Sequence, residues 1–274
     1  MCSHLMKISV SNITWGSENF TSFLEFIKQN GCDGVELAPS LIWNDPIKAN
    51  LSEIDLVRKN IERNELEFVG FHSLLYNKPN LLLFNTNTRI ETLNYLKELI
   101  NVCSDLNGKQ LVFGSPRNRV LNNRSVDDCL KQAKDDMLLL SEHAQKKNIF
   151  FCIEPLSPLE TEFLTSIKEG AIFVNKVNHP FFKLHLDTKA LYDTKENPQK
   201  IINEFQEIIQ HVHIGDKNLT APGTFNKSHK LIGDALNKIN YKKFISLEVK
   251  KNEKETKNSI IKSIQFMREN YLNA

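Results

Sequence analysis

Short apolar runs alternate with longer stretches of helical spacing along the whole sequence, and this alternation constrains the fold more than any other feature. The runs are rich in β-branched and aromatic residues, as strands are, whereas the apolar residues between them recur every three or four positions, as in amphipathic helices. Alternation of this kind predicts βα units with parallel strands, because a parallel pair needs a crossover connection long enough for a helix. We predict eight strands: Lys7 to Ser11, Gly34 to Leu37, Glu67 to His72, Gln110 to Gly114, Ile149 to Glu154, Phe182 to Asp187, His211 to Ile214 and Phe244 to Glu248.

The helical spacing is clearest in two stretches, one in the middle of the chain and one near its end. Apolar residues three or four positions apart share one face of a helix, so we expect that face to be buried. The residues concerned are Val126, Leu130, Ala133, Met137, Leu140 and Ala144, and then Ile260, Ile264, Met267 and Tyr271. Capping boxes are predicted at Ser125 with Asp128 and at Thr88 with Glu91, and helix ends at Asn30-Gly31 and Asn107-Gly108.

Eight parallel strands that are each followed by a helix close most naturally into a (β/α)8 barrel. Right-handed crossovers place every helix outside, and eight strands leave a lumen that side chains can fill. A doubly wound open sheet is the alternative, but it would carry a glycine-rich phosphate loop after its first strand, and residues 9–15 contain no glycine. We therefore expect an α/β protein with a single TIM-barrel domain over residues 1–274.

Charge and composition exclude several classes of function. The sequence has 35 Lys and Arg against 33 Asp and Glu, a net charge of +2, which is too balanced for a protein that grips nucleic acid. No apolar run approaches the roughly 18 residues that cross a bilayer, and residues 1–10 hold no apolar stretch of signal length, so we expect a cytoplasmic protein with no membrane partner. The cysteines are expected to be reduced packing residues, because they are scattered and form no C-x-x-C pair; they are Cys2, Cys32, Cys103, Cys129 and Cys152.

The last four predicted strands end on groups that can bind a metal ion. Glu154, Asp187, His213 and Glu248 stand at the carboxyl ends of these strands, which is where a barrel of this type gathers its reactive groups. Three carboxylates in one barrel mouth would repel one another unless a cation lay among them. Oxygen-rich ligation with one nitrogen suits Mn²⁺ or Mg²⁺ better than a structural zinc ion.

Strand alternation adds a second test of this site. The residues two positions before each candidate ligand should also face the lumen, and they are Cys152, His185, His211 and Ser246. An ordinary barrel layer would hold Val, Ile or Leu at such positions. Side chains that form hydrogen bonds can orient metal ligands from behind, and we assign His185 and His211 to this role. Histidines that simply satisfy their hydrogen bonds within the core are the alternative.

Seven short motifs give the sequence a family resemblance. They run from the first predicted strand to the last: Gly34-Val-Glu-Leu-Ala-Pro39, Phe71-His-Ser73, Val112-Phe-Gly-Ser-Pro-Arg117, Ile153-Glu-Pro-Leu156, Lys183-Leu-His-Leu-Asp-Thr188, His211-Val-His-Ile-Gly-Asp216 and Ile245-Ser-Leu-Glu-Val249. They resemble the sugar phosphate isomerase/epimerase group of the xylose-isomerase-like TIM barrels, which stands beside the ketose 3-epimerases and endonuclease IV.

The resemblance implies one divalent metal ion held by Glu154, Asp187, His213 and Glu248, with Glu154 and Glu248 facing each other across the substrate as a proton-transfer pair. We expect Mn²⁺, with Mg²⁺, Co²⁺ or Zn²⁺ as alternatives. A ketose that chelates such an ion can lose the proton beside its carbonyl to a carboxylate, which gives an enediolate. Return of the proton to the other face inverts the carbon, and return to the neighbouring carbon gives an aldose. The implied substrate is a small sugar or sugar phosphate, and related barrels often form dimers or tetramers.

Further candidate residues surround this core of four. Glu160 lies six positions after Glu154, as does a substrate-binding Glu in the ketose 3-epimerases, and His72 resembles a lumen-facing His of the wider family. Trp15 can form the floor of a sugar pocket, although a Trp at this place equally suits the core. Arg117 can clamp a phosphate or carboxylate in two hydrogen bonds, and so can Arg119, although arginines on a surface loop are the commoner case.

The sequence also departs from the ketose 3-epimerase pattern. Those enzymes carry a His three residues after the ligand Asp and an Arg six residues after the ligand His, and Ala190 and Leu219 occupy these places here. Recognition of the sugar must therefore differ. Lys189 and Lys217 stand nearby and can supply other hydrogen-bond donors, which would favour an anionic substrate; solvated loop lysines are the alternative.

Three other functions compete with sugar isomerisation or epimerisation. A DNA-repair enzyme of the endonuclease IV type needs a cluster of three zinc ions, and its extra ligands are missing, because Gly114, Ala190 and Lys227 stand where His, His and Asp would be required. A dehydratase similar to inosose dehydratase would use the same carboxylates. A non-catalytic sugar-binding barrel would have no need for the two opposed bases Glu154 and Glu248.

Overall fold

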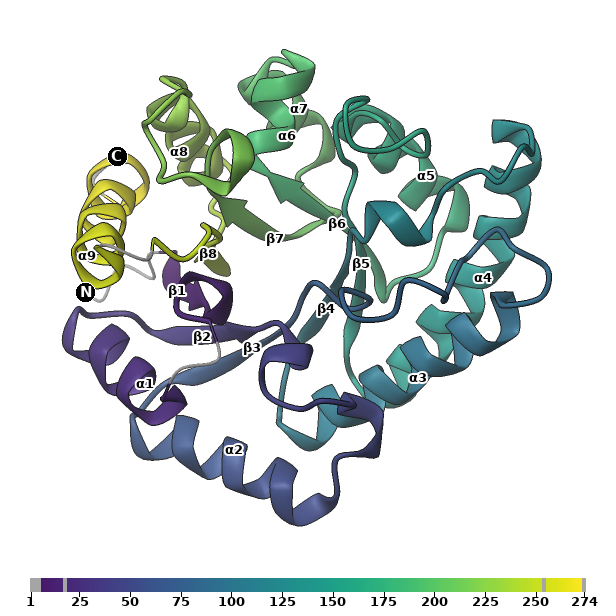
Figure 1. Ribbon diagram of the computed structural model, residues 1–274. Helices are drawn as coiled ribbons and strands as arrows, with labels where there is room; N and C mark the ends of the chain where they lie inside the picture. Colours follow the sequence, from purple (N-terminus) through teal and green to yellow (C-terminus); the bar gives the residue numbers. More distant parts are fainter. Residues whose placement is uncertain (1–5, 17–18, 253–254, 273–274) are drawn as a thin grey trace.

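The computed structural model, which describes residues 6–16, 19–252 and 255–272, is a closed barrel of eight parallel strands in chain order (Figure 1). The last strand pairs with the first, with Lys7 opposite Phe244 and Ile8 opposite Ile245. The predicted (β/α)8 TIM-barrel fold is therefore confirmed. The strands are β1 (Lys7–Ser11), β2 (Gly34–Leu37), β3 (Glu67–Phe71), β4 (Gln110–Phe113), β5 (Phe150–Ile153), β6 (Phe182–Asp187), β7 (Ile209–Ile214) and β8 (Phe244–Leu247).

The strand predictions are confirmed with small differences at the ends. β3, β4, β5 and β8 each end one residue before the predicted bound, because His72, Gly114, Glu154 and Glu248 already belong to the loops. β7 begins two residues before its predicted start, at Ile209. The polar residue Gln210 interrupts the apolar run there, yet it is buried and donates a hydrogen bond to Gln110.

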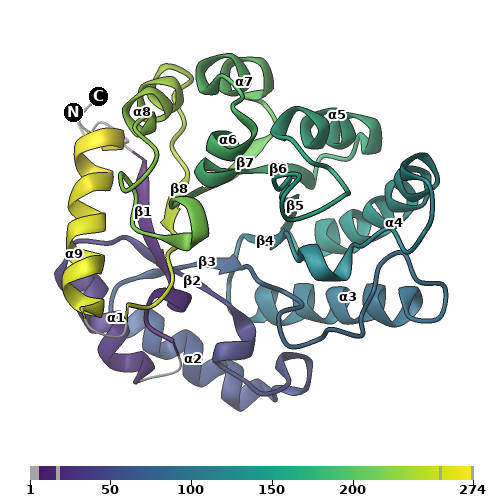
Figure 2. The same cartoon turned by 45° about the horizontal axis from the view of Figure 1, so that its top comes forward.

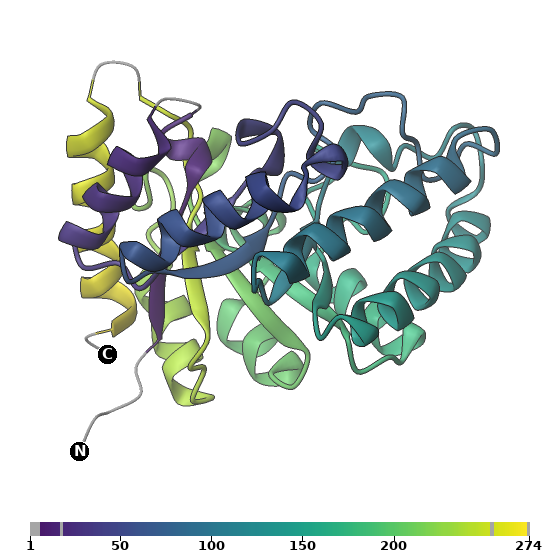
Figure 3. The same cartoon turned by 90° about the horizontal axis from the view of Figure 1, so that it is seen from below.

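Helices form an outer ring around the strands, and the connection after β6 contains two of them (Figures 1 and 2). In the side view the helices α3 and α4 lie next to each other along the barrel wall (Figure 3). The helices are α1 (Phe20–Gln29), α2 (Leu51–Arg63), α3 (Arg89–Asp105), α4 (Val126–Lys146), α5 (Ile167–Val177), α6 (Thr188–Thr194), α7 (Pro198–Phe205), α8 (His229–Lys238) and α9 (Thr256–Met267), which continues as a π-helical turn (Arg268–Leu272). Short 3₁₀ helices follow several strands: η1 (Asn12–Thr14), η2 (Pro39–Leu41), η3 (Pro46–Lys48), η4 (Pro116–Asn118) and η5 (Lys217–Leu219).

The predicted helix boundaries are correct in part. Ser125 caps α4 and accepts a hydrogen bond of 3.1 Å from the backbone N–H of Asp128. The capping box at Thr88 is wrong: Thr88 stands at the start of α3, but its hydroxyl donates to the carbonyl oxygen of Leu82 at 3.1 Å instead of capping the helix. The Thr88 hydroxyl therefore bonds to the loop before α3 rather than to the first turn of the helix.

Both Asn-Gly pairs end helices, but they do so through different residues. After α1, Gly31 takes the left-handed conformation, with a φ of 74°. After α3, Asn107 takes it, with a φ of 63°. Either residue allows the chain to turn back toward the next strand, because both tolerate a positive φ better than other residues do.

The lumen of the barrel is polar, in contrast to the apolar layer between strands and helices. Ser9 on β1 and Ser246 on β8 share a hydrogen bond across the seam where the barrel closes. One layer higher, the Ser11 hydroxyl lies 2.6 Å from Nε2 of His72. Barrels usually fill these layers with Val, Ile and Leu, so the polar lumen marks this region as a site rather than a simple core.

The cysteine prediction is confirmed for the residues that the structure describes. Cys32, Cys103, Cys129 and Cys152 are free and buried. Cys2 lies outside the described residues. Within the described ranges, none of the helices combines the length and the apolar character that a membrane span requires.

Candidate active site

The mouth of the barrel at the carboxyl ends of the strands contains a cavity of about 620 Å³, which we call the mouth cavity. Its walls bring together Asp187 at the end of β6 and residues from the segments that follow β3, β4, β5, β6, β7 and β8. Six of the residues predicted for the site line it: His72, Arg117, Glu154, Glu160, Asp187 and Glu248. A concave pocket with convergent polar groups is the usual form of a ligand site.

Backbone hydrogen bonds to a neighbouring strand hold three of these residues in place. His72, Glu154 and Glu248 each stand directly after a strand, and the backbone N–H of each still donates to the neighbouring strand at 3.0 to 3.1 Å. The side chains thus leave the sheet from a backbone that is still held by it, so little conformational freedom remains to be lost when a ligand binds. The accepting carbonyl groups belong to Leu37, Phe113 and Ile214.

The carboxylates of Glu154, Asp187 and Glu248 converge, with one oxygen of each within 4.8 Å of the others. Burial, together with the charges of Glu248 and Asp187, raises the pKa of Glu154 to about 8. Burial and the charge of Glu248 likewise raise the pKa of Asp187 to about 7. Concentrated negative charge of this kind is what a bound cation relieves.

Glu248 differs from the other two carboxylates in its partners. Its Oε2 lies 3.1 Å from Nδ1 of His213, and its Oε1 lies 3.1 Å from Nδ1 of His72. Burial alone would raise the pKa of Glu248, but the charge and hydrogen bond of His213, with those of His72, hold it well below its usual range. Glu248 is therefore ionised in surroundings where Glu154 tends to hold a proton.

His213 lies beside this cluster, and each of its ring nitrogens faces a carboxylate. Nδ1 faces Glu248, and Nε2 lies 3.0 Å from Oε2 of Glu36. Burial would lower the pKa of His213, but Glu248 and Glu36 raise it well above its usual value. Glu36 was missed by the sequence reasoning, and the signal that could have found it is a lone acidic residue within an apolar strand.

His185 and His211 lie deeper in the lumen, where both were predicted. The ring of His185 is 4.1 Å from that of His213 between centroids, and Nε2 of His211 lies 3.2 Å from Glu36. Burial and the charges of His213 and His211 hold the pKa of His185 well below its usual value, so this ring is neutral. The rings of His185, His211 and His213 pack against one another, with centroids 4.1 to 5.4 Å apart.

Gly114 provides the space that Glu154 occupies. A Cβ at this position would lie 2.0 Å from Oε2 of Glu154, so any side chain there would displace the carboxylate. Gly114 is also the place where an enzyme of the endonuclease IV type would need a histidine. A histidine at this position would therefore clash with Glu154 as the side chain is placed here.

The other predicted residues divide into two groups. Glu160 lines the mouth cavity and accepts hydrogen bonds from Lys189 and from Ser157, the latter at 3.3 Å. Lys189 lies in the same wall and also contacts Asp193 at 3.2 Å, so its ammonium group is already paired. Arg117 also lines the cavity and is exposed to solvent.

Two predicted substrate-binding residues lie elsewhere. Trp15 is buried against Phe23 and Phe26, with ring centroids 5.4 and 5.6 Å away, and it does not line the mouth cavity. Of the two expectations for Trp15, the structure therefore agrees with a core residue rather than with the floor of a sugar pocket. Lys217 is exposed in η5 and is also absent from the cavity wall. Trp15 directly follows the short helix η1, and Lys217 is the first residue of η5.

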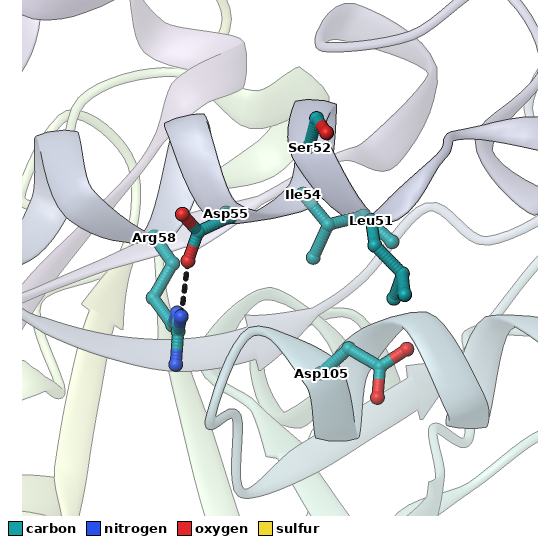
Figure 4. Close-up of a pocket in the computed structure, with 6 residues that line it drawn as sticks. All are labelled: Leu51, Ser52, Ile54, Asp55, Arg58 and Asp105. Atoms are coloured by element: carbon teal, nitrogen blue, oxygen red, sulfur yellow. Dashed lines mark hydrogen bonds and ion pairs between the residues drawn. The ribbon is translucent and has the colours of Figure 1, made fainter.

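A second hollow, of about 390 Å³, lies in the helical ring between α2 and α3 (Figure 4). The close-up shows Asp55 and Arg58 paired along α2, with Asp105 of α3 on the opposite side. An ion pair between neighbouring turns of one exposed helix stabilises that helix slightly and needs no ligand. We therefore place the candidate site in the mouth cavity.

Fold and site together define a (β/α)8 barrel whose mouth gathers three carboxylates, with the imidazole of His213 beside one of them. Residues 24–270 match the family described as "Xylose isomerase-like TIM barrel", and the chain belongs to this family. The resemblance noted from the motifs is thus confirmed.

Several proteins similar to this chain are named as sugar epimerases. The chain is 19% identical over 252 residues to 3-dehydro-D-guloside 4-epimerase from Escherichia coli (strain K12), a match that covers 89% of this chain and 92% of that protein. It is 26% identical over 126 residues to D-psicose 3-epimerase from Enterocloster bolteae, which covers 46% of this chain and 42% of that protein. The solved structure of D-psicose 3-epimerase with D-tagatose from Clostridium cellulolyticum H10 superposes with a TM-score of 0.82 at 17% identity, over 97% of this chain and 99% of that one.

Proposed function

We propose that this protein is a divalent-metal-dependent sugar epimerase that inverts a carbon beside a ketone by moving protons between the substrate and Glu154 and Glu248. The observation that carries the proposal is that these two carboxylates line one cavity in opposite charge environments. Carboxyl groups whose pKa values are pushed apart suit the roles of acid and base. The names of similar proteins, which are epimerases of a 3-dehydro-guloside, of D-psicose and of L-ribulose, support the same reaction class.

The donor set supports the metal requirement. Glu154, Asp187 and Glu248 offer convergent oxygens, and Nδ1 of His213 faces Glu248 with no protein partner other than this carboxylate. These four side chains would hold the ion, and three oxygens with one nitrogen favour Mn²⁺ among the candidates. When bound, such an ion polarises a carbonyl and acidifies the neighbouring C–H bond.

The proton transfers follow from the two charge environments. Glu248, kept ionised by His213 and His72, removes the proton from the carbon beside the carbonyl, which leaves an enediolate. Glu154, the second carboxyl group in the cavity wall, would deliver a proton to the opposite face of the same carbon. The carbon is thereby inverted, and the roles exchange when the reaction runs in the other direction.

The remaining wall of the mouth cavity would bind the sugar. Glu160 and Lys189 form a paired acceptor and donor that suit sugar hydroxyl groups, and Arg117 is an exposed cation in the same wall. We propose a keto sugar or its phosphate as the substrate class. A phosphorylated substrate would place its anionic group near Arg117, because the ammonium group of Lys189 already has two carboxylate partners.

Hydrogen exchange with solvent tests the proposal. The Mn²⁺-loaded protein is incubated in D₂O with ketoses, ketose phosphates and 3-keto-glycosides, and NMR follows the carbon-bound hydrogens beside each carbonyl. We expect one substrate class to exchange a single hydrogen and to yield its epimer. Glu154→Gln and Glu248→Gln should each slow the reaction by about 10²- to 10⁴-fold, the usual share of acid–base catalysis.

Glu207→Gln is the matched control, because Glu207 is exposed just before β7 and lies outside the cavity wall. It should exchange at the wild-type rate. Full exchange in both cavity variants would show that these carboxylates do not move the proton, and no exchange with any substrate would refute the reaction class.

A further inference from the structure

Glu36 is the charged residue of β2, and its carboxylate is completely buried in the barrel lumen. Val35 and Leu37 on either side are buried as well. The pairing of β2 with β3 shifts register between Val35 and Glu36, and the β3 residue opposite Glu36 is Gly70, which has no side chain. A buried carboxylate is costly to fold unless it is fully paired, so its partners should explain its presence.

Its partners are two histidines from the far side of the barrel. Nε2 of His213 lies 3.0 Å from Oε2 of Glu36, and Nε2 of His211 lies 3.2 Å from the same carboxylate. Both imidazoles are buried as completely as Glu36 is. An ionised carboxylate only accepts hydrogen bonds, so each of these Nε2 atoms must carry its proton.

This protonation pattern fixes the free nitrogen of His213. With the Nε2 proton committed to Glu36, the nitrogen left to bind a cation is Nδ1, and Nδ1 is the atom that faces the carboxylate cluster beside Glu248. The same contact limits rotation of the ring, because turning it would break a hydrogen bond to a buried charge. Ligating histidines commonly donate their second nitrogen to a carboxylate in this way.

We propose that Glu36 is a positioning residue that sets the tautomer and the orientation of His213, so that Nδ1 is the nitrogen offered to the divalent ion. This assignment rests on the proposed function, because it presumes that a metal ion occupies the mouth cavity. Glu36 acts through His213 and lies beneath the cavity rather than in its wall. His211 also contacts the Glu36 carboxylate, at 3.2 Å, and so helps to hold it beside His213.

The contacts of the carboxylate support this role. The Nε2 atoms of His211 and His213 both lie within 3.2 Å of the Glu36 carboxylate, as expected for a buried carboxylate that accepts two hydrogen bonds. A carboxylate that accepts from the ring in this way strengthens the basicity of His213 as a ligand.

Metal affinity measured without substrate tests the proposal. Mn²⁺ binding to the wild-type protein and to Glu36→Gln is measured by calorimetry, with circular dichroism to verify the fold. Gln keeps the size of the side chain but loses its charge and presents an amide that donates as well as accepts. We expect Glu36→Gln to bind Mn²⁺ about 10- to 100-fold more weakly, which is the usual effect of removing such a partner.

Glu67→Gln is the matched control. Glu67 lies at the start of the next strand, β3, is exposed, and pairs with Lys7 at the opposite end of the barrel. Its Mn²⁺ affinity should equal that of the wild-type protein. If Glu36→Gln also binds Mn²⁺ with wild-type affinity, Glu36 is not a positioning residue.

A second measurement needs no variant and covers the case in which Glu36→Gln does not fold. In ¹⁵N-histidine NMR of the Zn²⁺-loaded wild-type protein, His213 should show a metal-bound Nδ1 and a protonated Nε2. Coordination through Nε2 would overturn the assignment. If the wild-type protein binds neither Mn²⁺ nor Zn²⁺, the proposed function itself is wrong, whereas wild-type binding with an unaffected Glu36→Gln refutes the role of Glu36 alone.

Discussion

Two carboxylates in the barrel mouth owe their different behaviour to their neighbours. Glu154 faces other carboxylates, whereas Glu248 lies between two histidines. Identical functional groups thus acquire opposite protonation tendencies from position alone, which is the condition for an acid and a base to work on the two faces of one substrate. Asp187 shares the surroundings of Glu154.

The raised pKa values predict how the stability of the metal-free protein depends on pH. Glu154 and Asp187 hold protons in the folded chain up to pH values of about 8 and 7, whereas they lose them near pH 4 to 5 when unfolded. The folded chain therefore binds more protons than the unfolded chain, and stability falls as pH rises. We expect the unfolding free energy in EDTA to fall by about 1 kcal/mol per pH unit between pH 6.5 and 8.

Urea unfolding at several pH values checks this expectation. The window begins at pH 6.5 because His185 and His211, whose pKa values are lowered chiefly by burial, give the opposite slope at lower pH. Glu154→Gln lacks one of the titrating carboxyl groups and should give a flatter curve. A wild-type stability that is constant or rises across the window would contradict the charge description of the cluster.

Single residues were predictable where strand geometry alone places them. Glu154, Asp187 and Glu248 stand at strand ends, and parallel strands of a barrel deliver such residues to one mouth. Trp15 and Lys217 also follow strands, but each lies at a short 3₁₀ helix, which sequence spacing does not reveal. Glu36 escaped notice because its partners, His211 and His213, are 175 and 177 residues away.

At the level of elements, the residue after β4 must be small because the side chain of Glu154, which follows β5, occupies the adjacent space. Gly114 directly follows β4, and the missing Cβ leaves the place where Oε2 of Glu154 lies. We expect Gly114→Ala to push this carboxylate aside and to lower the exchange rate by about 10²-fold, because misplacing a reacting group by about 1 Å has effects of this size. Stability should change little, since the obstructing atom is the end of a side chain that can move.

Gly233→Ala gives the opposite pattern and serves as the matched control. Gly233 lies in α8, and its Cβ would meet the backbone oxygen of Asn270 at 2.0 Å, in the π-helical turn that follows α9. Backbone cannot yield as a side chain does, so we expect a loss of about 1 to 3 kcal/mol in stability with unchanged exchange. Wild-type exchange in Gly114→Ala would show that the position of Glu154 does not limit the reaction.

Elements themselves were predictable because the two periodicities are strong. The strands and the long helix α4 follow from apolar spacing, and Ser125 caps α4 as its sequence indicates. The failure at Thr88 has a different source: its hydroxyl bonds Leu82 in a loop whose path depends on tertiary packing. Local motifs therefore fix element types better than they fix hydrogen-bond partners.

At the scale of the whole molecule, barrel closure is what creates the site. β2 and β7 lie on different sides of the ring, yet Glu36 and His213 meet in the lumen because the strands enclose it (Figure 1). The family could be inferred from motifs spread over the chain, and the match over residues 24–270 confirms it. The sugar could not, because Ala190 and Leu219 replace family positions and the new contacts depend on loop geometry.

The stoichiometry and affinity of Mn²⁺ binding test the central claim most directly. Calorimetric titration of the metal-free protein should show one Mn²⁺ per chain. Asp187→Asn should weaken binding at least about 10-fold, because it would remove the charge of one proposed ligand while keeping the size of the side chain. The absence of Mn²⁺ binding to the wild-type protein, or equal affinity in Asp187→Asn, would contradict the account of the barrel mouth as a metal-dependent site.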